Sequence, residues 1–97
     1  MKTLEEIKEI LNNHKKELHK DYKVKEIGIF GSYVRGEHKG KSDLDILVEF
    51  EETIDFFDFL ELEERLSEIL NSNVDLVMKK ALKPDIGKYI LNEVVYV

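Results

Sequence analysis

Residues 31–48 read GSYVRGEHKGKSDLDILV, a Gly-Ser pair followed by a short basic loop and then by two aspartates at alternate positions of an apolar run. Side chains alternate between the two faces of a β-strand, so Asp43 and Asp45 are predicted to point to the same face. The apolar residues of the run are predicted to point the other way, into a core: Leu44, Ile46 and Val48. Adjacent carboxylates repel each other, and a divalent cation between them relieves the repulsion. Because hard oxygen ligands suit Mg²⁺ that carries a nucleotide's phosphates, the pattern indicates a metal–nucleotide site.

A short strand and a short helix are predicted around the Gly-Ser pair. Val24–Phe30 (VKEIGIF) is rich in β-branched and aromatic residues, and Gly31-Ser32 ends it where the chain turns into a helix over residues 32–35. A helix N-terminus offers unpaired backbone N–H groups, glycine lets a ligand approach the backbone, and the serine hydroxyl adds a donor. Gly31 and Ser32 are therefore predicted to bind phosphate. The alternative is an ordinary turn with Ser32 as the helix cap, and both interpretations can hold together.

A third carboxylate stands in a later apolar run. Val74–Met78 (VDLVM) places Asp75 within a predicted strand, on the face opposite to its apolar neighbours. If this strand pairs with the strand that carries Asp43 and Asp45, three carboxylates converge. The alternative for Asp75 is a surface carboxylate on an edge strand, because a single aspartate in this run has no motif of its own.

The arrangement of these residues resembles the nucleotidyltransferase superfamily that includes DNA polymerase beta. Gly31-Ser32 is followed, after ten residues, by Asp43-Leu44-Asp45, and Asp75 lies on a later strand. The tighter pattern, Gly-Ser-x-x-Arg-Gly and then Ser-Asp-x-Asp, is similar to the minimal nucleotidyltransferases, small prokaryotic proteins often encoded beside a HEPN-domain toxin. The resemblance runs from about residue 24 to residue 77. Val34 stands where that family more often has Ala, a departure that affects no catalytic residue.

The resemblance implies both a fold and a set of site residues. The fold would be an α/β (α+β) domain like the polymerase beta palm, with a small mixed or antiparallel sheet and helices packed on one face. Asp43 and Asp45 would hold two Mg²⁺ ions that bridge a triphosphate, and Asp75 would complete the second metal site. Gly31, Ser32 and Arg35 would bind the nucleotide, although Arg35 could also pair with an acid. Three other basic residues of the loop lie where the triphosphate would be: His38, Lys39 and Lys41. For His38 and Lys39, side chains that are merely solvated are the preferred interpretation.

The resemblance also implies an activity and a partner. The protein would transfer AMP from ATP to a hydroxyl and release pyrophosphate, and the acceptor would be a tyrosine of a HEPN-type ribonuclease toxin, which the modification silences. One alternative is a non-catalytic antitoxin that masks its partner. Another is nucleotidyl transfer to a small molecule, as in the similar aminoglycoside-modifying enzymes, which carry additional domains for the drug.

Length and composition narrow these expectations. The 97 residues form one domain, residues 1–97, too small to add a module that grips a substrate. The net charge of −6 disfavours direct nucleic-acid binding and suits a basic protein partner. The chain has no cysteine, which excludes thiol catalysis and fits a reducing cytoplasm. No apolar run approaches membrane-spanning length, so a cytoplasmic protein without membrane contact is expected.

The remaining elements follow from hydrophobic spacing and capping signals. Thr3 and Glu6 form a capping-box pattern that begins one helix, predicted to continue to about Lys20. A second long helix is predicted over residues 55–70, a last helix from Pro84, and a short strand over residues 94–97. His14 and His19 are five residues apart on the first helix and are not expected to share a metal. Two apolar residues lie off the main apolar face of the helix predicted over residues 55–70: Phe57 and Leu60. Either an irregular first turn packs Phe57 inward, or the two residues form an exposed apolar patch for a partner chain.

Overall fold

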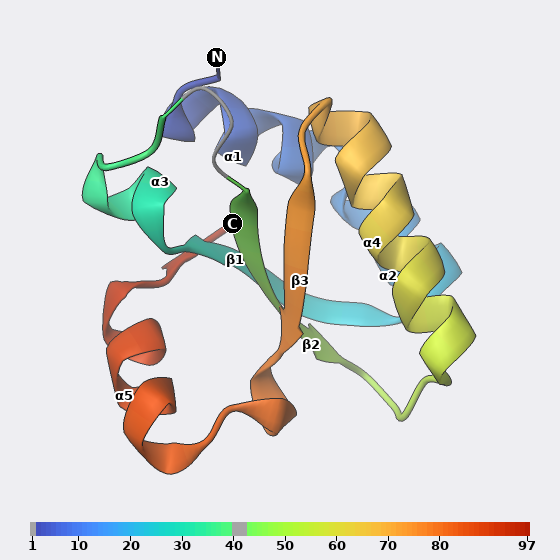
Figure 1. Ribbon diagram of the computed structural model, residues 1–97. Helices are drawn as coiled ribbons and strands as arrows, with labels where there is room; N and C mark the ends of the chain where they lie inside the picture. The colour runs from blue at the N-terminus through green and yellow to red at the C-terminus, as the bar shows by residue number, and fades with distance from the viewer. Residues whose placement is uncertain (1, 40–42) are drawn as a thin grey trace.

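The computed structural model describes residues 2–39 and 43–97, and a four-stranded mixed sheet runs through its centre (Figure 1). The strands lie in the order β3-β2-β1-β4; β1 is antiparallel to β2 and β4, whereas β2 and β3 are parallel. Their bounds are Val24–Phe30 for β1, Leu44–Phe50 for β2, Val74–Met78 for β3 and Val95–Tyr96 for β4. β1 and β3 coincide with the predicted strands, β2 contains the alternating run that was predicted as a strand, β4 is shorter than predicted, and the sheet is of the mixed type expected.

Three helices bury one face of this sheet: α1 (Leu4–Asn13), α2 (Lys15–Tyr22) and α4 (Phe56–Leu70) (Figure 1). Their apolar stripes meet the inward side chains of the strands, and the helical members of this core are fully buried: Ile7, Leu11, Leu18, Leu62, Leu66 and Leu70. Leu44, Ile46 and Val48 of β2 lie in the same core, as predicted. Burying each such side chain contributes about 1.5–3 kcal/mol. Packing this face leaves the aspartate-bearing face of β2 and β3 free of these three helices.

Two further helices lie together on the left of Figure 1: α3 (Ser32–Arg35), which follows β1, and α5 (Pro84–Glu93), which precedes β4. A 3₁₀ turn, Lys79–Ala81, links β3 to this region. Pro84 occupies the first turn of α5, as its missing N–H and fixed φ favour. Among the described residues, no helix is long and apolar enough to cross a membrane.

The N-terminal segment differs from the prediction of one helix to Lys20, because the chain breaks at His14 between α1 and α2. The predicted capping box is present at the start of α1, where Thr3 and Glu6 bond to each other's backbone N–H. At the break, the His14 N–H donates to Leu11 O at 3.1 Å, a tight i to i−3 bond that ends the helix. The His14 ring also bonds Ile10 O, at 2.8 Å. His14 and His19 are therefore structural residues, since His19 Nδ1 bonds Val24 O at 3.1 Å.

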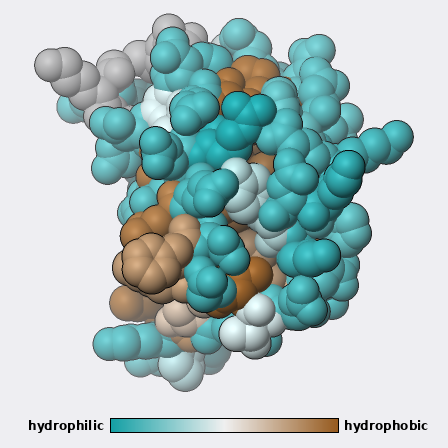
Figure 2. All heavy atoms as spheres, turned by 90° about the vertical axis from the view of Figure 1, so that its right-hand side faces the viewer, coloured by the Kyte–Doolittle hydropathy of each residue, from teal (hydrophilic) through white to brown (hydrophobic). Residues whose placement is uncertain are grey.

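The start of α4 exposes an apolar patch made by Phe56, Phe57 and Leu60. Asp55 caps the helix by accepting the Asp58 N–H at 2.8 Å, so the first turn is regular and does not tuck Phe57 inward. Phe56 and Phe57 are 67% and 79% exposed. Figure 2, which views the α4 side, shows brown hydrophobic atoms gathered within a mostly hydrophilic surface. Of the two interpretations of Phe57, exposure is confirmed, and its use by a partner stays a prediction.

Candidate active site

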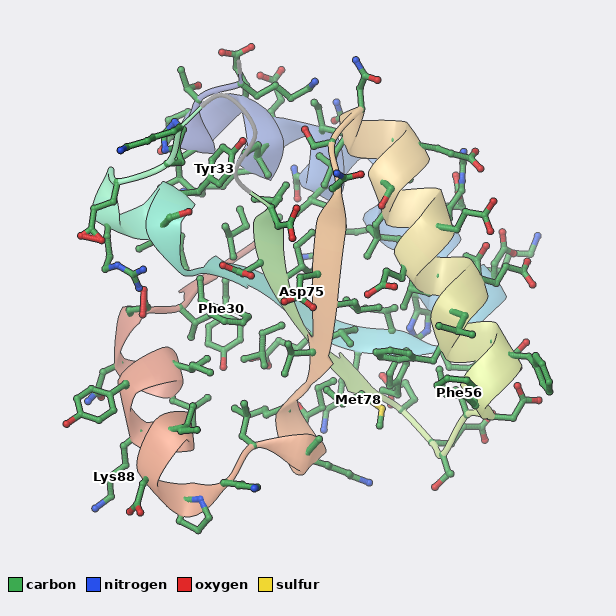
Figure 3. All side chains as sticks on the ribbon, in the orientation of Figure 1. Phe30, Tyr33, Phe56, Asp75, Met78 and Lys88 are labelled. Carbon is green, nitrogen blue, oxygen red and sulfur yellow. The ribbon has the colours of Figure 1, made fainter. Side chains whose placement is uncertain are left out.

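The carboxylates predicted from the two apolar runs meet across neighbouring strands. Asp45 of β2 stands directly opposite Asp75 of β3 in the parallel ladder, and adjacent strands are about 4.8 Å apart. Asp43 is exposed and immediately precedes β2, Asp45 is half-buried, and Asp75 is exposed. Figure 3 shows Asp75 beside β2 and away from α4. Of the three carboxylates expected to converge, Asp45 and Asp75 therefore lie side by side on neighbouring strands, whereas the described part of the chain holds no group of three acidic side chains close enough to share a metal ion.

The pKa of Asp45 is raised above its usual value of 3.8, mainly because burial disfavours the charged form. The neighbouring carboxylates of Asp75 and Asp43 raise this pKa further, whereas the Arg35 guanidinium lowers it. Negative charge is thus concentrated here at a cost to the folded state. Such a cost is typical of groups placed for binding or catalysis rather than for stability.

Asp45→Asn is expected to stabilise the nucleotide-free protein at neutral pH. A carboxyl group with a raised folded pKa contributes stability that is complete below the unfolded pKa, 3.8, and is lost as the pH rises through the folded pKa. Urea unfolding of both proteins across this range should show an advantage of the variant that grows with pH and vanishes below about pH 3.8. The same advantage at every pH would contradict this origin.

Gly31 brings the Gly-Ser turn into contact with Asp45. Its φ of 82° and ψ of −152° lie in a region open essentially to glycine alone. A Cβ added at Gly31 would overlap Asp45 Oδ2 and lie 2.9 Å from Asp45 Cγ. Ser32, next in the chain, is half-buried and begins α3. The predicted phosphate-binding residues and the predicted metal ligands therefore form one continuous site.

In the basic loop after α3, His38 is not a solvated side chain as was preferred from the sequence. The His38 ring stacks on the buried ring of Tyr33, with centroids 4.1 Å apart and planes 4° from parallel. His38 Nδ1 is buried and has no hydrogen-bond partner among the described residues. His38 is thus a packed side chain, because the aromatic face of Tyr33 offers it a surface that solvent does not. Lys39 is exposed, as preferred, and Lys41 lies outside the described residues.

Arg35 pairs with acids, one of the two roles left open for it. Its Nε donates to Glu37 Oε1 at 2.8 Å, and its Nη1 donates to Glu93 Oε1 and Oε2 at 2.8 and 3.2 Å. Its other predicted role, contact with a phosphate, stays a prediction. Glu93 also accepts the Gly31 N–H at 3.1 Å. Sequence reasoning missed Glu93, since it belongs to no motif and is separated from Gly31 by 62 positions.

The donor set suits a divalent cation that arrives with a nucleotide. Among residues 2–39 and 43–97, no three His, Asp or Glu side chains are grouped closely enough to hold a metal ion by themselves. Mg²⁺ does not need such a cage, because it is bound through one or two carboxylates together with substrate phosphates and water. The repulsion felt by Asp45 and the close approach of the Gly31 backbone to the Asp45 carboxylate both fit that mode of binding.

Comparison with known proteins agrees with the geometry. A family model described as nucleotidyltransferase domain matches residues 11–97. The protein adenylyltransferase MntA of Thermococcus cleftensis is 60% identical over 97 residues, which are all of this chain and 98% of the relative. A solved toxin–antitoxin structure with AMP-PNP has a TM-score of 0.71 at 30% identity, covering 87% of this chain and 69% of that one.

A second solved structure is similar over most of the chain: a tri-AMPylated HEPN toxin in complex with MNT antitoxin from Shewanella oneidensis. It has a TM-score of 0.65 at 26% identity, and the match covers 92% of this chain and 70% of that one. The high identity to MntA over the full length and the match of the family model decide the classification. The chain belongs to the nucleotidyltransferase domain family, within which it is a minimal nucleotidyltransferase.

Proposed function

We propose that this chain transfers AMP from ATP to a tyrosine of a HEPN-type toxin in the cytoplasm, and so acts as that toxin's antitoxin. The observation that carries the proposal is the contact between the Gly31 turn and Asp45, with Asp75 opposite in the ladder. A phosphate-binding turn directly against paired carboxylates suits nucleotidyl transfer. The relatives support the finer points: MntA is named a protein adenylyltransferase, and the similar complex contains an AMPylated HEPN toxin.

Each side chain of the site has a place in this reaction. Asp43 and Asp45 would hold Mg²⁺, and Asp75 would complete a second ion site next to the acceptor. The ions would neutralise the triphosphate and favour the ionised acceptor hydroxyl. The Ser32 hydroxyl and the backbone of the turn would orient the terminal phosphates, and Arg35, at the other end of α3, would add positive charge beside them. The tyrosine oxygen bonds to the α-phosphorus, the bond from this phosphorus to the bridging oxygen breaks, and pyrophosphate and the hydroxyl proton leave.

This chemistry needs positioning and charge neutralisation, and it needs no nucleophile from the protein. That requirement matches a site made of carboxylates, a serine and backbone groups. In one of the similar solved structures the AMP groups are carried by a HEPN toxin that is in complex with the antitoxin. This complex favours a partner protein over a small molecule as the acceptor that we propose.

The test is to incubate the chain with ATP, Mg²⁺ and the HEPN-type protein encoded beside it, and to measure the intact mass of that protein. We expect a gain of one or more AMP units, located on tyrosine by fragmentation. A stable complex that silences the toxin without added mass, and does so equally well when Asp43 and Asp45 are both Asn, would support the masking alternative. AMP found only on small molecules, and not on the protein, would support the alternative of nucleotidyl transfer to a small molecule.

Asp75→Asn is expected to bind ATP and Mg²⁺ with nearly unchanged affinity and to lose most of its turnover. The reason is that the ion carried by the triphosphate relies on the paired aspartates, whereas the acceptor side of the site relies also on Asp75. Calorimetric titration with ATP measures the first quantity, and the rate of AMP transfer measures the second. Normal turnover would return Asp75 to the role of a surface carboxylate.

A further inference from the structure

Glu93, the last residue of α5, holds both ends of α3. Its Oε1 accepts the N–H of Gly31, the residue that precedes α3, at 3.1 Å. The same carboxylate accepts bonds of 2.8 and 3.2 Å from Arg35, the last residue of α3. α3 has four residues and no side-chain cap at its start, because Gly31 has no side chain to offer. A carboxylate from a distant helix thus accepts the N–H of the residue that precedes α3, as the glutamate of a capping box does, and also anchors the far end of α3.

The sheet brings Glu93 to this position. β4 starts two residues after Glu93 and pairs with Gly28 and Ile29 of β1, the strand that leads into Gly31. The approach of the two segments is close, since a Cβ at Gly28 would lie 2.7 Å from Val94 Cγ2. The ladder therefore places the end of α5 beside the Gly-Ser turn.

The rest of α5 gives little support to this placement. Gly87 is the one described residue of α5 that is buried, and Ile86 and Tyr89 are 58% and 77% exposed. The Glu93 side chain is 22% exposed, compared with 61% for Glu37, the other partner of Arg35. A charge-assisted contact that is shielded from solvent is worth more than an exposed one. Glu93 is accordingly the stronger of the two carboxylate partners of Arg35, and the exposed Glu37 adds little to the placement of α3.

The position of Glu93 has an electrostatic cost. It adds a carboxylate near Asp45, whose pKa it raises, at the edge of a site that is proposed to receive a triphosphate. Arg35 offsets this cost because its guanidinium neutralises Glu93 and also lowers the pKa of Asp45. An acid kept in such surroundings indicates a geometric role, since its charge by itself opposes the binding of an anion.

We propose that Glu93 is a positioning residue of the nucleotide site. By holding Gly31 and Arg35 it fixes the turn against Asp45 and aims the donors of Ser32 at the triphosphate, without touching the nucleotide itself. The inference rests on the proposed function only in that the site receives ATP. It assigns to the C-terminal helix a part in nucleotide binding that the motif residues alone do not reveal.

The test compares Glu93→Ala and Glu93→Gln in the full chain, with Glu37→Ala as the matched control. Glu37→Ala removes the other carboxylate of Arg35, at 2.8 Å from Nε, and leaves the Gly31 bond intact. Glu93→Gln keeps an oxygen that can accept the Gly31 N–H. We expect Glu93→Ala to raise the ATP dissociation constant and KM by on the order of tenfold, the effect of one charge-assisted hydrogen bond. Glu93→Gln should restore most of the affinity, and Glu37→Ala should resemble the unmodified protein.

A readout without nucleotide separates this inference from the proposed function. Amide hydrogen exchange at Gly31 should become on the order of tenfold faster in Glu93→Ala, while the amides of Ile27 and Ile29 in β1 keep their protection. Faster exchange and weaker ATP binding in a protein that transfers no AMP would retain Glu93 and reject the transfer reaction. Unchanged exchange at Gly31, or tighter ATP binding by Glu93→Ala, would overturn the inference, the latter because the carboxylate would then be a competitor of the triphosphate. If Glu93→Ala does not fold, the same two quantities are measured in Glu93→Gln, which loses the charge but keeps an acceptor. A modest rise in the ATP dissociation constant with somewhat faster exchange at Gly31 would support the inference, and no change in either quantity would overturn it.

Discussion

Replacing both Asp43 and Asp45 by Asn should reduce AMP transfer by about a thousandfold or more, because it removes the charges proposed to hold the metal that neutralises the triphosphate. The size corresponds to about 4 kcal/mol of transition-state stabilisation. Each single change should act in the same direction, and each should weaken binding of ATP with Mg²⁺. The measurements are the initial rate of transfer to the partner and calorimetric titration with ATP.

A matched control is available on the same strand. Glu49→Gln makes the same carboxylate-to-amide change on β2, four positions beyond Asp45 and away from the Gly31 turn, and should keep normal transfer. The double variant should remain folded, since removing ionised Asp45 relieves repulsion instead of creating a cavity. Undiminished ATP affinity in the folded double variant would count against the assignment of these two aspartates.

Gly31→Ala is expected to destabilise the protein by about 3 kcal/mol or more and to abolish nucleotide binding. The strain of a non-glycine residue in this backbone region contributes about 1–3 kcal/mol. The new Cβ also overlaps Asp45 Oδ2, so either the turn or the Asp45 side chain has to move. Chemical denaturation measures the loss of stability, and ATP titration at low temperature measures the loss of binding.

Gly36→Ala separates these two contributions. Gly36 has a φ of 72°, but a Cβ there would meet nothing within 4 Å, so only backbone strain of about 1–2 kcal/mol is expected. The steric part can be isolated by combining Gly31→Ala with Asp45→Ala, which removes the overlapping oxygen. The double variant should be clearly more stable than the sum of the two single effects predicts. Simple additivity would show that the overlap is relieved elsewhere at little cost.

The motif residues could be assigned from the sequence because their placement depends on local geometry. Alternation along VDLVM and DLDILV fixes which side chains share a face, and burial of the apolar set then forces the aspartates outward. Capping signals act over one turn, so the capping box at Thr3 and the start of α5 at Pro84 were predictable for the same reason. The break at His14 was not, because the apolar stripe continues in register on both sides of it.

By itself the sequence predicted three of the strands, the outward direction of the aspartates and the Gly-Ser turn, and the roles of the carboxylates stay predictions. The tertiary structure decided which groups meet: Asp45 with Asp75 in register, His38 with Tyr33, and Glu93 with Gly31 and Arg35. Glu93 shows why these contacts cannot be predicted from local sequence patterns. Its partners are 58 and 62 positions away, and no periodicity extends over such a distance. The partner of a polar side chain is fixed only when the strands pair and the core closes, because strand pairing brings the ends of β1 and α5 together.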